Sequence, residues 1–206
     1  MQLEEVVLLC KEPIHQQLKR LIPGAQVAMA FILAMFSEGN SVMMDSLLQD
    51  LSLTETTLYF RHYLFEAYYQ TGRIERIREG FAFWNQLIDK GLLTPVERHE
   101  PSRSDCHAWS SHPLFHLWGS LLGIRPQAPG FREISIKPQI ADLGNVQAKM
   151  PHPKGSIHYR QIVDASRISI TVRAPESLSG QLRWHGKSYP LERGELNFEW
   201  NRKSTT

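Results

Sequence analysis

The apolar residues of this chain change their spacing near residue 123, and that change limits the folds open to it. Up to that point several apolar sets recur every three or four residues, as on one face of a helix. One set is Phe60, Tyr63, Leu64, Ala67 and Tyr68, and the next is Ile74, Ile77, Phe81, Trp84 and Ile88. Later segments alternate polar and apolar residues, as in strands with one buried face. These segments are Glu133–Lys137, Ser156–Tyr159 and Arg167–Arg173. The chain is therefore predicted to be α+β, with helices first and strands after them.

Glycine and proline mark the boundaries of these elements. Gly72, Gly91 and Gly123 are predicted to end helices, because glycine adopts the left-handed conformation that follows a helix at little cost. The short break at Gly72 predicts an antiparallel helical hairpin. Prolines and a glycine between residues 126 and 138 exclude a long helix there. We expect a helical domain over residues 1–125 and an antiparallel β-sandwich over residues 126–206.

The composition narrows the class of protein. The chain has 206 residues, 42% of them hydrophobic and 21% charged, which is typical of a globular domain rather than a disordered one. Its net charge of +2 gives no reason to expect nucleic acid or a membrane surface as a partner. The apolar run Val27–Phe36 is too short to cross a bilayer, and no signal peptide is recognisable. Two cysteines do not make a disulfide framework, so a cytoplasmic location is expected.

One stretch concentrates groups that a sugar site uses. It runs from Arg103 to Pro113 and reads RSDCHAWSSHP, and Thr94-Pro95-Val96-Glu97 comes shortly before it. Carboxylates move protons, histidine and aspartate bind hydroxyls, and tryptophan stacks on a sugar ring. With Gly123-Ile124-Arg125-Pro126 and Pro129-Gly130-Phe131 behind it, this order resembles the C-terminal part of bacterial α-L-rhamnosidases. The resemblance extends from about residue 26 to the strands near residue 173.

The resemblance implies a fold and a set of roles. Members of the family join an (α/α)6-barrel catalytic domain to a C-terminal β-sandwich, and they hydrolyse rhamnosides with inversion, which takes two carboxyl groups. Glu97 matches the general base, and His107 matches a histidine that contacts the sugar. Trp109 is assigned to sugar stacking, with core or interface packing as an equal alternative. Arg103 either pairs with Glu97 and keeps it ionised or is a surface arginine.

Several simpler interpretations stand beside these roles. Glu97 could be a solvated loop residue, and His107 could bond the backbone at a helix start. Asp105 is predicted to be a helix N-cap.

Zinc ligation is not expected, since Pro113 interrupts the candidate ligands and no paired Cys motif accompanies them. A Cys106 nucleophile is disfavoured because adjacent helical residues point about 100° apart. The candidate zinc ligands are Cys106, His107, His112 and His116. An aromatic set is assigned to packing between helices: Tyr59, Tyr63, Tyr68, Tyr69, Phe81, Phe83 and Trp84.

The resemblance covers part of the family's architecture. The periodicity predicts about half the helices of the barrel, and the family's general acid lies upstream of the matched segment. We therefore expect the C-terminal half of a barrel, followed by the sandwich, which is inactive alone and needs no cofactor. Its expected partners are a rhamnose-containing oligosaccharide or glycoside and the missing N-terminal half or another chain. Two alternatives are a non-catalytic carbohydrate-binding or accessory protein and a subunit that completes its barrel with another chain.

Overall fold

The computed structural model describes residues 56–139 and 143–202. The chain divides into two compact units, Met1–Pro113 and Leu114–Thr206, and each is described by itself. The helix predicted over Val27–Phe36 and the last four residues lie outside the described residues. No helix of the described ranges is long and apolar enough to cross a membrane.

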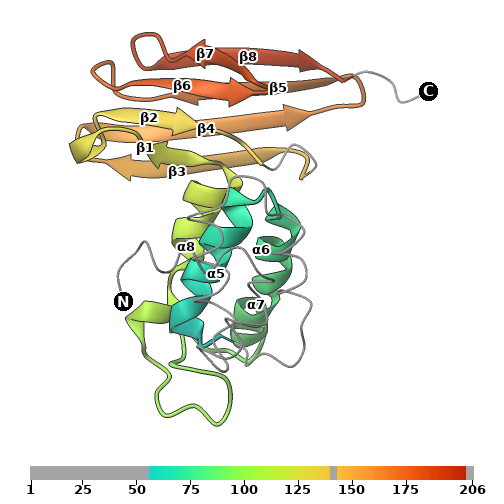
Figure 1. Ribbon diagram of the computed structural model, residues 1–206, viewed down its shortest axis with the longest axis vertical. Helices are drawn as coiled ribbons and strands as arrows, with labels where there is room; N and C mark the ends of the chain where they lie inside the picture. The colour runs from blue at the N-terminus through green and yellow to red at the C-terminus, as the bar shows by residue number, and fades with distance from the viewer. Residues whose placement is uncertain (1–55, 140–142, 203–206) are drawn as a thin grey trace, which may run out of the picture. The chain divides into compact units, whose positions relative to one another are not determined.

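The described part of the first unit includes the helices α5 (Leu58–Gln70), α6 (Ile74–Gly80) and α7 (Ala82–Asp89), which are shown in Figure 1. Helix α5 begins at Thr57, whose side chain accepts a hydrogen bond of 3.4 Å from the amide of Phe60 and so caps an otherwise free donor. It ends before Gly72, which has φ of +74°, and Gly91 follows α7 with φ of +81°. The predicted helix ends at these glycines and the hairpin between α5 and α6 are confirmed.

The buried faces of these helices differ from the prediction in part. Phe60 and Ile88 were expected to be buried, but they are 48% and 68% exposed, and Leu58 and Leu87 are buried in their places. Leu58, Leu87 and Val96 form a small core. The predicted single helix after residue 74 is interrupted at Phe81, whose amide bonds the carbonyls of Ile77 and Arg78. The single predicted helix is thus two helices, α6 and α7, which meet at Phe81.

Close packing explains one glycine of this unit. A Cβ atom on Gly80 would lie 2.5 Å from the ring of Phe65. Phe65 is 1% exposed and contacts the rings of Phe81 and Trp84 at centroid distances of 5.8 and 6.2 Å. The aromatic set expected to pack between helices does so at these residues.

The segment after Asp105 is less regular than predicted. We expected one helix up to Gly123, but the chain forms a 3-10 turn η2 (Ala108–Ser110), a short helix α8 (Pro113–His116) and a π-helical turn η3 (Leu117–Leu121). The predicted end at Gly123 is confirmed. Gly123 has φ of +65°, and a Cβ atom there would lie 2.0 Å from the carbonyl oxygen of Lys137.

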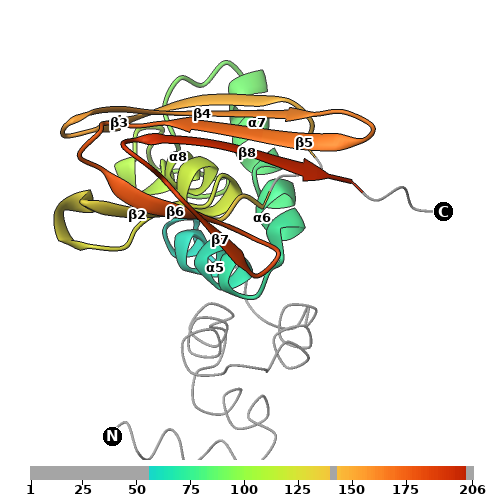
Figure 2. The same cartoon turned by 90° about the horizontal axis from the view of Figure 1, so that it is seen from above.

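The second unit is a β-structure of two four-stranded sheets, drawn as two layers in Figure 2. One sheet has the order β1-β2-β6-β7 and the other β3-β4-β5-β8. A 3-10 turn η4 (Pro129–Phe131) connects β1 to β2. The strands are β1 Ile124–Pro126, β2 Glu133–Ile136, β3 Val146–His152, β4 Gly155–Val163, β5 Arg167–Arg173, β6 Ser179–Trp184, β7 Lys187–Pro190 and β8 Glu195–Asn201.

The two sheets bury their facing sides against each other. Phe198 of β8 contacts Trp184 of β6 and Tyr189 of β7, with ring centroids 5.6 and 4.7 Å apart. The pairing is antiparallel except between β2 and β6, which run parallel. The prediction of an antiparallel sandwich is wrong for that pair. Its paired residues, such as Glu133 and Ser179, lie far apart in the sequence, and sequence alternation does not reveal the direction of pairing. The α+β class, with helices before two largely antiparallel sheets, is confirmed.

Candidate functional site

A loop between α7 and the 3-10 turn carries the candidate site. Two backbone hydrogen bonds join its two arms: the amide of Glu97 donates to the carbonyl of Ser104 at 2.9 Å, and the amide of His107 donates to Pro95 at 2.8 Å. The hydroxyl of Thr94 also donates to the carbonyl of Asp105. These bonds hold the Thr94–Glu97 segment beside the Arg103–Trp109 segment, so the two halves of the motif are adjacent in space.

Glu97 is buried, with 7% of its surface exposed, although it lies in a loop. The Arg103 guanidinium donates to both carboxylate oxygens, at 2.9 Å from Nε to Oε2 and by a shorter contact from a terminal nitrogen to Oε1. This bond from Arg103 holds the pKa of Glu97 below its ordinary value, and the nearby charges of His107 and Arg98 act in the same direction. Glu97 is therefore kept ionised, as a proton acceptor must be.

Glu97 borders a cavity of about 350 Å³. The described residues that line it are Thr57, Tyr59, Glu97, Arg98, Arg103 and Trp109. The indole nitrogen of Trp109 donates to the carbonyl of Glu97 at 3.4 Å, so the loop that carries the carboxylate also fixes the tryptophan. Trp109 is 45% exposed, which leaves a large part of its ring open to a ligand.

Tyr59 forms a second aromatic wall of this cavity. It is 44% exposed, and its ring meets Trp109 edge to face with centroids 5.8 Å apart. Tyr59 was expected to pack between helices, which is wrong for this residue. The signal that could have identified it is the favoured N-cap residue Thr57, which places Tyr59 in the first turn of α5.

His107 lies next to the cavity rather than among the residues that line it. Its ring lies against Trp109, with centroids 4.5 Å apart, and its Nδ1 is buried without a hydrogen bond within the described structure. Asp105 is exposed, and the N-cap position of the 3-10 turn is His107, without a side-chain cap bond. The predicted cap role of Asp105 is therefore wrong, because the helical turn begins at Ala108 instead of Cys106.

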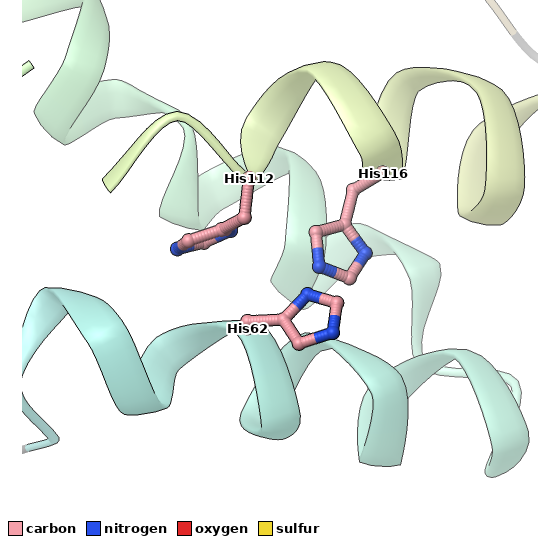
Figure 3. Close-up of side chains that lie close together, drawn as sticks. All are labelled: His62, His112 and His116. Atoms are coloured by element: carbon pink, nitrogen blue, oxygen red, sulfur yellow. The ribbon is translucent and has the colours of Figure 1, made fainter. Parts of the chain in front are cut away.

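Histidines from another part of the unit could hold a metal ion. His62 of α5 and His112 offer ring nitrogens within 4.8 Å of each other, and their ring centroids are 5.8 Å apart. Figure 3 shows these two side chains together with His116, which follows His112 by one helical turn. Nε2 of His112 donates to the carbonyl of Leu58 at 3.0 Å, and burial lowers the pKa of His112 to about 4. His112 is therefore neutral at pH 7, as a histidine must be to bind a metal ion.

This histidine group differs from the candidate zinc ligands chosen from the sequence. His62 was not considered, because it lies far away in the sequence and carries no motif. Cys106 and His107 do not belong to the group, and Cys106 is an exposed free thiol.

Comparisons with known proteins agree on one family. The model of the bacterial α-L-rhamnosidase C-terminal domain matches residues 123–180. An α-L-rhamnosidase of Alteromonas sp. (strain LOR) is 25% identical over 116 residues, which cover 50% of this chain and 13% of that protein. The resemblance to the C-terminal part of bacterial α-L-rhamnosidases is confirmed.

Solved structures of rhamnosidases share this fold. The family GH78 rhamnosidase of Bacillus sp. GL1 aligns with a TM-score of 0.68 and 23% identity, over 78% of this chain and 18% of that one. The α-L-rhamnosidase of Dictyoglomus thermophilum gives 0.67 and 16%, over 86% and 25%. The Streptomyces avermitilis α-L-rhamnosidase in complex with L-rhamnose gives 0.66 and 16%, over 85% and 21%. The chain thus spans a quarter or less of these α-L-rhamnosidases.

Proposed function

We propose that this chain is the C-terminal portion of an α-L-rhamnosidase-like inverting glycoside hydrolase and supplies the general-base side of its sugar site. Glu97 takes the proton from the attacking water. Trp109 stacks on the sugar, and His107 and Arg103 bind or orient it. The ligand is a rhamnose-containing glycoside, since L-rhamnose is the ligand named for the Streptomyces avermitilis relative.

The observation that supports this most directly is an ionised carboxylate at the edge of an open aromatic cavity. Glu97 lines about 350 Å³ of space beside the partly exposed ring of Trp109. Aromatic ring faces suit the C–H surface of a sugar, and a carboxylate within reach of that sugar can bind and deprotonate a water.

Because Glu97 is paired with Arg103, its action as a general base requires one additional step. Both oxygens of Glu97 accept bonds from Arg103, so one oxygen must be released before it can accept a proton from water. The Arg103 side chain is 70% exposed and can move into solvent at low cost. The base is thus held ionised by Arg103 and becomes available when Arg103 turns towards a substrate hydroxyl.

An inverting reaction also needs a general acid about 6.5–9.5 Å from the base. Among the described residues that line the cavity, Glu97 is the carboxylate and the others are neutral or basic. We infer that the acid comes from a barrel half not represented in the described residues, and that the described part does not turn over substrate by itself. A cytoplasmic location belongs to the same proposal, and the free thiol of Cys106 is compatible with a reducing compartment.

The second candidate is a non-catalytic carbohydrate-binding protein. The same ion pair favours it, because a carboxylate with both oxygens bonded and a lowered pKa is a weak base but a good acceptor for sugar hydroxyls. In that case Glu97 and Arg103 form a fixed polar pair beneath a stacked sugar.

Complementation separates the two candidates. The chain is mixed with the N-terminal part of a family α-L-rhamnosidase and assayed on an aryl α-L-rhamnoside. We expect no turnover by the chain alone, turnover by the mixture, and its loss with Glu97→Gln, since an amide cannot accept the proton of water. Arg98→Gln is the matched control, because Arg98 lines the same cavity and bonds the carbonyl of Pro101 rather than Glu97. Turnover that survives Glu97→Gln would contradict the catalytic role.

A further inference from the structure

The outward face of the β3-β4-β5-β8 sheet carries a cluster of basic side chains. Lys149, His158 and Arg173 lie directly opposite one another on β3, β4 and β5. Arg160 is two residues after His158 on β4, on the same face of the sheet. It is therefore diagonal to both Lys149 and Arg173. All four are exposed, while their neighbours Ile157, Tyr159 and Val172 are buried on the other face.

These four residues form a compact group. Neighbouring strands lie about 4.8 Å apart and alternate residues of a strand about 6.7 Å apart, so the Cα atoms fit within roughly 10 Å. Within the described residues, none of the four makes an ion pair or a side-chain hydrogen bond. By contrast Arg167, on the same face of β5, pairs with Glu199 at 3.3 Å and Asp164 at 3.7 Å. Glu195 opposes Arg173 and is the acidic residue next to the group.

Such an arrangement weakens a sheet. Opposite charges across strands stabilise and like charges destabilise, yet here three permanent cations and an imidazole are grouped with one carboxylate beside them. Proteins retain local arrangements of this kind where function requires them. We propose that this face binds an acidic oligosaccharide, a chain of sugars bearing carboxylates.

The other groups on the face indicate a sugar rather than a nucleic acid. The residues that continue the cluster are amides and hydroxyls, which bond sugar hydroxyls. They are Gln147, Thr171 and Asn197, with Gln147 and Thr171 opposite Arg160 and Asn197 opposite Thr171. A face that binds single-stranded nucleic acid carries aromatic rings for base stacking. Apart from the imidazole of His158, the outward positions of these strands carry no aromatic ring in the described residues.

This site is independent of the proposed catalytic role. It lies in the second unit, and none of its residues lines the cavity beside Glu97. A failure of the rhamnosidase proposal would therefore leave it standing, and the reverse also holds.

The test uses the full chain and three probes of similar length: an oligogalacturonate, a neutral oligoglucose and a single-stranded oligodeoxynucleotide. Binding is measured by isothermal titration calorimetry at low and high salt. We expect binding of the oligogalacturonate that weakens with salt, weaker or absent binding of the nucleotide chain, and no binding of the neutral sugar. The double variant Lys149→Gln/Arg160→Gln should lose roughly fivefold in affinity, the scale of two exposed charge contacts.

The matched control is Arg183→Gln/Lys187→Gln, which removes one arginine and one lysine from exposed positions of β6 and β7 in the other sheet. It should leave the affinity within twofold. Absence of binding by the unaltered chain, tighter binding of the oligonucleotide, or equal losses in the two double variants would each overturn the proposal. Circular dichroism verifies folding, and the comparison of probes with the unaltered chain does not depend on any variant.

Discussion

The Arg103 guanidinium covers both carboxylate oxygens of Glu97, and the two partners differ sharply in exposure. The carboxylate side chain is 8% exposed and the arginine 70%. A buried carboxylate is thus held ionised by an arginine that solvent can reach. A change at the exposed arginine can therefore alter the ionisation of Glu97. This relationship governs how the site responds to pH and to mutation.

The first prediction concerns Arg103→Gln in the complemented enzyme. The lowered pKa of Glu97 keeps the base ionised, so catalysis persists until the pH falls through that pKa. Without the guanidinium the pKa of Glu97 rises, and the acidic limb of the kcat profile should move to higher pH. The measurement is kcat against pH. Arg98→Gln should move the limb less, because the charge of Arg98 lowers the pKa of Glu97 less than the bond from Arg103 does. An unmoved limb would show that Arg103 does not set the protonation of Glu97.

The second prediction concerns the aromatic walls. Tyr59→Ala and Trp109→Ala should each weaken the binding of a rhamnoside by roughly fivefold, because an aromatic contact contributes about 1 kcal/mol beyond buried area. Phe60→Ala is the control: Phe60 neighbours Tyr59 on α5 and is 48% exposed, but it does not line the cavity. Equal losses at Phe60 and Tyr59 would mean that the effect arises from α5 in general.

The third prediction concerns stability in acid. The pKa of His112 is lowered to about 4 by burial, below the 6.5 of the unfolded chain. The unfolded state therefore takes up the proton first, so this contribution to stability is intact above pH 6.5 and is lost as the pH falls towards 4. Denaturation followed by tryptophan fluorescence between pH 7.5 and 4 should show this decline, and His112→Gln should flatten it. A decline of the same size in the His112→Gln protein would contradict this role of His112.

The fourth prediction concerns the core of the sandwich. The buried hydroxyl of Tyr159 donates to Gln161 at 3.0 Å, and the amide nitrogen of Gln161 donates to the carbonyl of Gly144 at 3.0 Å. Tyr159→Phe removes the first bond inside the buried core and should cost about 0.5–1.5 kcal/mol of unfolding free energy. Tyr189→Phe, at a half-buried position of β7, should cost less in the same urea titration. A larger cost at Tyr189 would contradict the importance of the buried network.

The local sequence pattern predicted some strands correctly and missed others. Strand β5 matches its prediction at both ends, because Arg167–Arg173 alternates without interruption. Strand β3 was not predicted, and it contains Pro151 near its end. Among the described strands it lies at the edge of its sheet, a position where proline is tolerated because a ladder hydrogen bond is not needed on the open side. The parallel pairing of β2 with β6 is a long-range feature that no local pattern contains.

The residues of the candidate site were likewise predicted only in part. Motif order placed Glu97, Arg103 and Trp109 together, and all three line one cavity. The motif could not indicate Tyr59, which comes from α5 nearly forty residues earlier. It could not indicate how His107 is oriented either, because the 3-10 turn begins one residue after it.

The most direct test of the central claim is a titration of the isotope-labelled chain with L-rhamnose, followed by backbone and indole NMR signals. If Glu97 and Trp109 form half of a rhamnose site, the amide of Glu97 and the indole N–H of Trp109 should shift in a saturable way, and the signals of strands β3 to β8 should not. Glu97→Gln and Trp109→Ala should weaken that response, while Phe60→Ala should preserve it. If L-rhamnose at saturating millimolar concentration leaves both signals unmoved, or shifts residues away from this cavity instead, the assignment of the site is wrong.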